Sequence, residues 1–144
     1  MILLIECQQE EYLMWLCQNK SFLSVVAPSP NDPKAVAGDV LLVRARVKGH
    51  INNVFPAAEE IKVLGRDYQF RAYIPRAEVA TAIAAAVTAI DYPNFKNSVQ
   101  DHDLHKAYAD VWGVMAKIQD FPPYQTRPRK PAARITAATS RQHD

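Results

Sequence analysis

Two segments of the chain alternate apolar and polar residues in the same way, and this pattern constrains the fold more than any other feature. Residues 40–47, VLLVRARV, and residues 67–74, DYQFRAYI, each place every second apolar side chain on one face of an extended strand. Tyr68 belongs to the apolar face in this interpretation. The opposite faces carry a set of basic and aromatic side chains: Arg44, Arg46, Arg71 and Tyr73.

The segments around these strands predict a hairpin and several helices. Residues 12–27 contain two short apolar runs separated by Gln18–Ser21, which favours a β-hairpin with a polar turn. Apolar residues at helical spacing predict one or two helical turns before Pro56. The alanine-rich residues 76–90 predict a helix with one apolar stripe. A last helix, at about residues 103–119, has a stripe from Leu104 to Ile118 that we expect to close the core.

The order β-β-β-α-β-α-α predicts an α+β domain with two layers, a mainly antiparallel sheet and helices on one face. The chain has 144 residues, of which 49% are hydrophobic, so it can build a single core. We expect one domain over residues 1–120, with residues 1–13 as a candidate N-terminal extension, and a separate tail over residues 121–144.

The tail accounts for the net positive charge of the chain. Residues 121–144 contain five basic residues and one acid, whereas residues 1–120 contain 12 basic residues and 14 acids. Four prolines and few apolar residues predict that this tail is disordered. Its candidate contacts to an anionic partner are Arg127, Arg129, Lys130 and Arg134. A solubilising extension without a partner is the alternative.

The sequence contains little that indicates catalysis. Its four glycines are scattered and form no phosphate-binding loop, and no nucleophile or paired metal motif occurs. We therefore expect a protein that is not an enzyme, with no cofactor, no metal and no catalytic residues. His102 and His105 leave one alternative open, an enzyme or metal-binding protein, although a histidine pair three residues apart is a weak signal. Asp101 or Asp103 is expected to cap the last helix, and Asp91 or Asn94 a preceding turn.

The start of the chain does not resemble a secretion signal, because acids follow early and no basic segment precedes the apolar residues. No apolar run reaches the roughly 18 residues that a membrane-spanning helix needs. We expect a cytoplasmic protein that makes no membrane contact.

Several of these motifs occur together in a family of small proteins. The strands LLVRARV and DYQFRAYI, followed by IDYPNFKNSV and HKAYADVWGVM, resemble an uncharacterised family of bacterial and phage α+β proteins. The resemblance covers about residues 14–120. It implies a family but no activity and no functional residues.

The sequence therefore leads to three functional hypotheses. The first is a small binding or regulatory module whose polar sheet face recognises nucleic acid or an acidic protein surface. The second is a phage or mobile-element inhibitor that blocks a host defence complex by protein contact, and the third is the enzyme or metal protein that uses the two histidines. Against the first stands the ordinary alternative that these arginines pair with carboxylates such as Asp67, Glu78 or Asp91.

Overall fold

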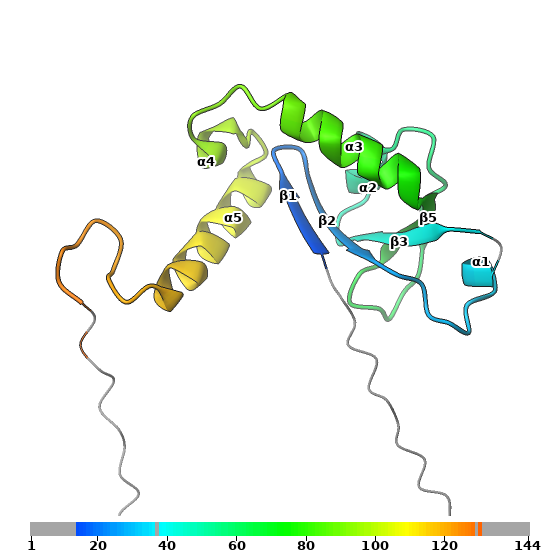
Figure 1. The fold of residues 1–144 in the computed structure, drawn as a ribbon, viewed down its shortest axis with the longest axis horizontal. Coiled ribbons are helices and arrows are strands. Elements are labelled where there is room, and N and C mark those ends of the chain that lie inside the picture. The colour runs from blue at the N-terminus through cyan, green and yellow to red at the C-terminus, as the bar shows by residue number, and fades with distance from the viewer. Residues whose placement is uncertain (1–13, 37, 129, 131–144) are drawn as a thin grey trace, which may run out of the picture. The chain divides into compact units, whose positions relative to one another are not determined.

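The computed structural model describes residues 14–36, 38–128 and 130 (Figure 1). The chain forms two compact units, Met1–Tyr108 and Ala109–Asp144, and the division falls within helix α5, His102–Met115. The predicted N-terminal extension and most of the predicted disordered tail lie outside the described residues. The predicted domain boundary near residue 120 stays a prediction.

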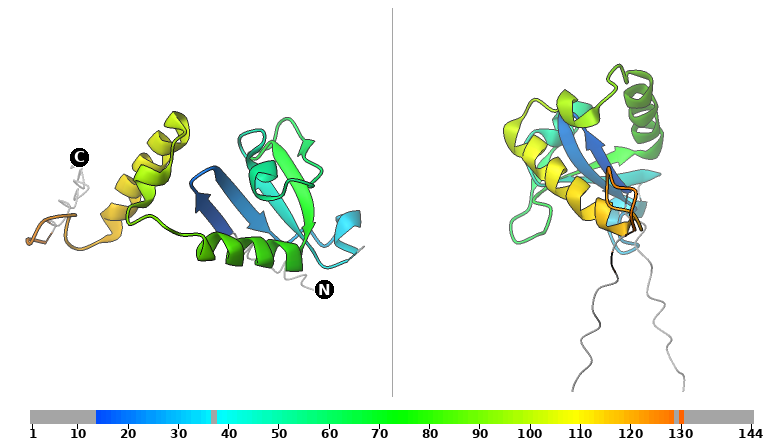
Figure 2. Two further views of the ribbon diagram at one scale, coloured as in Figure 1. Left: turned by 90° about the horizontal axis from the view of Figure 1, so that it is seen from above. Right: turned by 90° about the vertical axis from the view of Figure 1, so that its left-hand side faces the viewer.

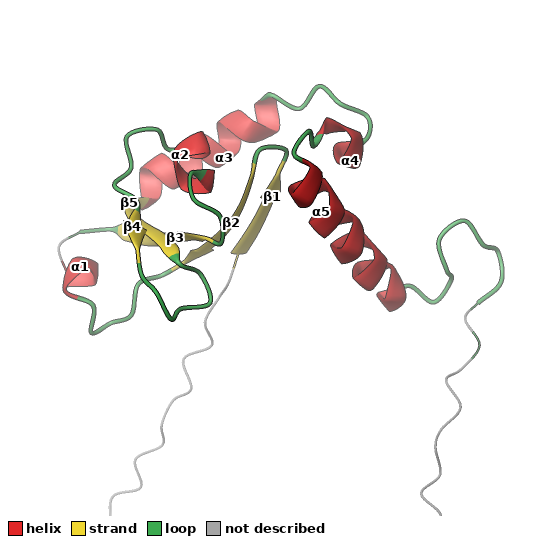
Figure 3. Ribbon diagram, turned by 180° about the vertical axis from the view of Figure 1, so that it is seen from behind, coloured by secondary structure: helices red, strands yellow, loops and turns green. Residues whose placement is uncertain are grey.

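The described residues form strands and helices in an interleaved order (Figure 3). The strands are β1 Met14–Gln18, β2 Ser21–Val26, β3 Val40–Ala45, β4 Ile61–Lys62 and β5 Phe70–Pro75. The helices are α1 Pro33–Val36, α2 His50–Val54, α3 Arg76–Thr88, α4 Phe95–Ser98, α5 His102–Met115 and the short 3-10 helix η1 Ala116–Ile118. The sequence did not predict α1 and β4.

The five strands make one antiparallel sheet in the order β1-β2-β3-β5-β4. The predicted hairpin is present, with Gln18 paired to Ser21 across a two-residue turn. Its first strand, β1, forms one edge of the sheet. These observations confirm the predicted α+β class with its antiparallel sheet.

Helices α2 and α3 pack against one face of the sheet, and together they form the main core (Figure 2). The apolar side chains of β2, β3 and β5 supply one side of this core, and α2 and α3 supply the other. Burying these side chains provides the main driving force for folding. The buried members are Leu23, Val25, Val43, Ala45, Ile51, Phe55, Phe70, Ala72, Ile74 and Val79.

A smaller apolar cluster forms where α4 and the start of α5 meet the hairpin. Val99, Leu104 and Tyr108 are buried there, and Phe22 and Phe95 pack against them. The Tyr108 hydroxyl donates to the carbonyl oxygens of Gln18 and Ser21 at 2.9 and 2.8 Å. Tyr108 therefore ties α5 to the turn of the hairpin.

The helix caps follow the sequence prediction. Asn94 precedes α4, and its side chain accepts a hydrogen bond from the Asn97 backbone N–H. The Asp101 carboxylate accepts from the Leu104 backbone N–H at 2.8 Å, which satisfies one of the free donors at the start of α5. Asp101 rather than Asp103 is therefore the cap of α5.

The structure corrects the predicted burial of both long helices. In α3, Val79 is buried, but Val87 is 63% exposed. In α5, the stripe is buried at Leu104 and Tyr108, while Trp112 and Ile118 are 43% and 76% exposed. Only the first half of the α5 stripe closes an apolar cluster. No helix among the described residues is long and apolar enough to cross a membrane.

Candidate arginine site on the sheet

The face of the sheet opposite α2 and α3 carries two arginines side by side. Arg44 of β3 and Arg71 of β5 are directly opposite each other in the antiparallel register. Side chains of opposed residues in an antiparallel pair lie on the same face, so the two guanidinium groups share one region. The alternation in the sequence predicted this placement.

The Tyr68 ring packs against both Arg44 and Arg46. The chain turns through Gly65, which has a φ of +77°, so that β5 begins only at Phe70 and Tyr68 belongs to the preceding loop. The guanidinium carbons of Arg44 and Arg46 lie 4.8 and 4.4 Å from the centre of the Tyr68 ring, within the range of cation–π attraction.

The position of Tyr68 corrects the sequence interpretation. The period-two pattern placed this side chain on the apolar face with Phe70, but it stacks on the arginine face instead. The pattern failed because strand alternation ends where the strand ends. Tyr68 is only 4% exposed, so the loop covers part of a face that we expected to be open.

Arg44 is consequently buried, with 9% of its surface exposed. Its Nη2 donates to the Ser24 hydroxyl at 2.9 Å. Its Nε is buried without a hydrogen-bond partner among the described residues. A buried donor without a partner costs roughly 1–3 kcal/mol, so this atom marks a place where the described part of the chain leaves an arginine unsatisfied.

Arg46 and Arg71 hold the covering loop by hydrogen bonds. Arg46 Nη1 donates to the Asp67 carbonyl oxygen at 3.0 Å, and Arg71 Nε donates to the Tyr68 carbonyl oxygen at 3.1 Å. Arg71 Nη2 also lies 3.6 Å from Asp67 Oδ1, which is the pairing with Asp67 that the ordinary alternative anticipated. Arg46 is exposed, whereas the Arg71 side chain is 19% exposed.

The electrostatic surroundings of Arg71 are dominated by positive charge. Burial lowers the pKa of Arg71 below its usual value, and the nearby charges of Arg44 and Arg66 lower it further. Asp67 acts in the opposite direction. Arginine stays charged in proteins, so the consequence is a region that attracts anions rather than one that titrates. We call Arg44, Arg46, Arg66 and Arg71 the arginine cluster.

Tyr73 lies on the same face as Arg71 but is engaged elsewhere. Its hydroxyl donates to the Asp32 carboxylate, and the Lys34 ammonium lies 4.9 Å from the centre of its ring. The hydrogen bond to Asp32 raises the pKa of Tyr73, and the same bond lowers the pKa of Asp32. Tyr73 therefore holds the segment before α1 against the sheet and is not free to stack on a base.

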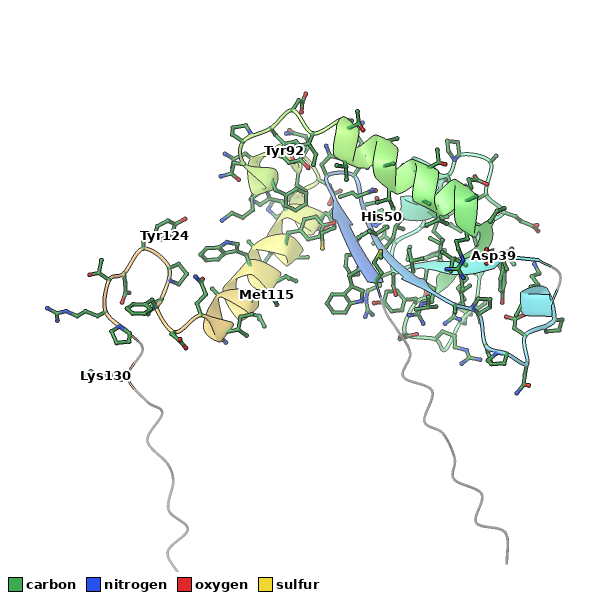
Figure 4. All side chains as sticks on the ribbon, viewed as in Figure 1. Asp39, His50, Tyr92, Met115, Tyr124 and Lys130 are labelled. Carbon is green, nitrogen blue, oxygen red and sulfur yellow. The ribbon has the colours of Figure 1, made fainter. Side chains whose placement is uncertain are left out.

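The basic tail is described only in part. Arg127 and Lys130 are exposed, while Arg129 and Arg134 lie outside the described residues. Figure 4 labels Lys130, together with Tyr124, in the unit formed by Ala109–Asp144.

The two histidines make separate polar contacts. His102 Nδ1 lies 3.3 Å from Asp103 Oδ1 with both side chains in solvent, and His105 Nδ1 lies 3.4 Å from the Val99 carbonyl oxygen. Within residues 14–36, 38–128 and 130, no three His, Cys, Asp or Glu side chains are grouped closely enough to hold a metal ion.

Sequence reasoning identified Arg44, Arg46 and Arg71 but missed Tyr68 and Arg66. Both missed residues lie in the loop after Gly65, where no strand or helix period applies. The glycine, which is suited to a positive φ, is the available signal that the chain turns before β5, where Tyr68 then packs against Arg44 of β3.

Comparison of the chain with protein-family models, with curated proteins and with solved structures gives no match. The resemblance to a family of bacterial and phage proteins therefore stays a prediction.

Proposed function

We propose that this protein is a non-enzymatic module that binds the phosphate groups of nucleic acid through the arginine cluster. The observation that carries the proposal is the crowding of arginines around Tyr68, with burial and two positive neighbours lowering the pKa of Arg71. An anion placed there would relieve the repulsion among these groups.

The arrangement suits phosphate because guanidinium groups are planar and donate two parallel hydrogen bonds to oxygen anions. Arg46 and Arg66 are exposed and can reach a ligand directly. Arg44 contributes its positive charge from a buried position. Its stacking on Tyr68 holds the loop that carries Arg66. Arg71 donates to the same loop. Arg44 and Arg71 thus position the region, Arg66 is exposed, and Arg46 is exposed while also bonding to the loop.

The same geometry argues against recognition of bases. Tyr68 is buried against Arg44 and Arg46, and the Tyr73 ring is held by its hydroxyl bond to Asp32 with the Lys34 ammonium over it. Neither ring presents an open face for stacking, which base recognition in single strands generally uses. We therefore propose contacts to the sugar–phosphate backbone, with little dependence on base sequence.

The basic tail would add to this affinity without being the main site. Arg127 and Lys130 are exposed, and the tail is rich in positive charge. Such residues contribute salt-sensitive phosphate contacts irrespective of their geometry.

The test measures binding of the full chain to double-stranded DNA and to single-stranded RNA over a series of salt concentrations. The double variant Arg46→Gln, Arg66→Gln removes two exposed charges and leaves the buried Arg44 in place. Losing two phosphate contacts should reduce the slope of log affinity against log salt by about 2 on DNA. A matched control, Lys20→Gln with Arg76→Gln, removes the same charge elsewhere. Arg76 is exposed and pairs with Asp39, labelled in Figure 4.

A second variant separates the contribution of the arginine cluster to binding from the contribution of the tail. In this variant, the tail residues Arg127, Arg129, Lys130 and Arg134 are all changed to Gln. We expect it to retain a salt slope that the Arg46→Gln, Arg66→Gln change still reduces. The proposal is wrong if neither nucleic acid binds at low salt, if the double variant behaves like its control, or if the tail variant abolishes all binding. Binding of an acidic protein but of neither nucleic acid would favour the other anionic partner.

A further inference from the structure

A groove runs between the edge strand β1 and the C-terminal part of α3, and all the residues that line it belong to the unit Met1–Tyr108. It has a volume of about 560 Å³, and its walls include Trp15, Cys17, Ile83, Val87 and Ile90. It lies on another part of the sheet from the arginine cluster, and its interpretation is independent of the proposed function.

Among the described residues, strand β1 pairs with β2 alone, and its other edge lies along this groove. Because Gln18 pairs with Ser21 across the two-residue turn, Gln18, Leu16 and Met14 direct their N–H and C=O groups toward β2. Trp15 and Cys17 alternate with them and direct theirs away from the sheet. An open row of this kind is a template for another strand.

The usual protections of an edge strand are missing from β1. Met14–Gln18 contains no lysine, no other charged residue and no proline, and its register with β2 has no bulge. Natural sheets generally use such features to prevent pairing between edges. Strand β1 is therefore not protected against pairing with another strand.

The opposite wall of the groove is also uncharged. No charged residue occurs from Val79 to Ile90, although 22% of the chain is charged. Three apolar side chains that line the groove are more than half exposed: Trp15 at 57%, Val87 at 63% and Ile90 at 53%. An occupant must therefore be an extended, uncharged and apolar segment, because a buried charge without a partner is costly.

We propose that the occupant is β1 of a second copy of this chain, paired antiparallel across a two-fold axis at Leu16. This register sets Trp15 of each copy opposite Cys17 of the other, so the outward N–H and C=O groups of both residues satisfy one another. β1 is itself apolar and uncharged and thus matches the wall that it meets. The two sheets become one continuous sheet.

The contact area places this dimer at the weak end of specific interfaces. One five-residue strand edge and the few apolar side chains beside it form a contact smaller than the roughly 800 Å² per partner of a standard stable interface. The dimer should therefore form and dissociate with concentration rather than persist as an obligate pair.

Sedimentation of the full chain over a wide concentration range tests this inference. Cys17→Pro removes an N–H that β2 does not use, so the hairpin retains its own bonds while the second copy loses a donor. Ile90→Glu places a charge on the other wall at an exposed position. Ile118→Glu is the matched control, because Ile118 is 76% exposed and lies outside the groove. Circular dichroism confirms that each variant is folded.

The expected result is a concentration-dependent dimer for the unmodified chain and for Ile118→Glu, with at least a tenfold weaker association for Ile90→Glu. Cys17→Pro should weaken association as well. A chain that remains monomeric at all concentrations overturns the inference. A dimer that Ile90→Glu leaves unchanged overturns it too, even if Cys17→Pro fails to fold.

Discussion

Replacing Tyr108 by Phe removes a single hydroxyl group that joins two parts of the fold distant in sequence. This hydroxyl donates to the carbonyl oxygens of Gln18 and Ser21 at 2.9 and 2.8 Å, and Tyr108 is 6% exposed. The hydroxyl has one proton to share between the two acceptors, so about one net hydrogen bond is lost. Both carbonyls belong to the paired ends of the hairpin.

The expected cost combines the lost bond with the reduced satisfaction of two buried acceptors, which gives a loss of about 1–2 kcal/mol in the free energy of unfolding. Urea denaturation followed by circular dichroism measures it. Tyr124→Phe is the matched control, because Tyr124 is 97% exposed and its hydroxyl faces solvent. The reasoning fails if Tyr108→Phe costs no more than the control.

The Tyr108 hydroxyl also makes the free energy of unfolding depend on pH in a direction that can be predicted. Burial raises the pKa of Tyr108 above its ordinary value of about 10. Above that pH the unfolded chain releases the proton and the folded chain keeps it, so the free energy of unfolding falls as pH rises. Below about pH 10 this contribution is fully present. Tyr108→Phe should flatten the decline, and an equal decline in both proteins would contradict the assignment.

Two further changes test the core and a helix cap. Leu23→Ala, at a position with no exposed surface, should lower the free energy of unfolding by about 2–5 kcal/mol, whereas Leu64→Ala, at 73% exposure, should have little effect in the same urea titration. Asp101→Ala removes the acceptor for the Leu104 backbone N–H and should cost about 0.5–2 kcal/mol. The exposed Asp103 provides its control, and an equal cost for Asp103→Ala would show that Asp101 is not the cap.

Local patterns in the sequence were sufficient for most of the elements. Period-two alternation located β3 and β5, the turn residues located the hairpin, and the alanine-rich segment located α3. These features depend on neighbours along the chain, so they can be read without knowing what the element packs against. The short carboxylate and amide caps at Asp101 and Asn94 were predictable for the same reason.

The extent to which each helix is buried could not be predicted from local sequence patterns. Val79 and Val87 belong to one stripe of α3, yet only Val79 packs in the core, because Val87 lines the groove beside β1. Leu104 and Ile118 likewise share a stripe of α5 but differ in exposure. A period shows which residues share a face, whereas the length of the surface opposite decides how many of them are covered.

Part of the arginine face could likewise be predicted from the sequence, and the rest depended on the tertiary structure. The sequence by itself determined that Arg44 and Arg71 would project from strands on the side opposite the core, since alternation requires it. Only the tertiary structure decided that the loop after Gly65 brings Tyr68 over Arg44 and adds Arg66 to the cluster. Loop conformation depends on contacts between residues distant in sequence, and those contacts have no period that a sequence can display.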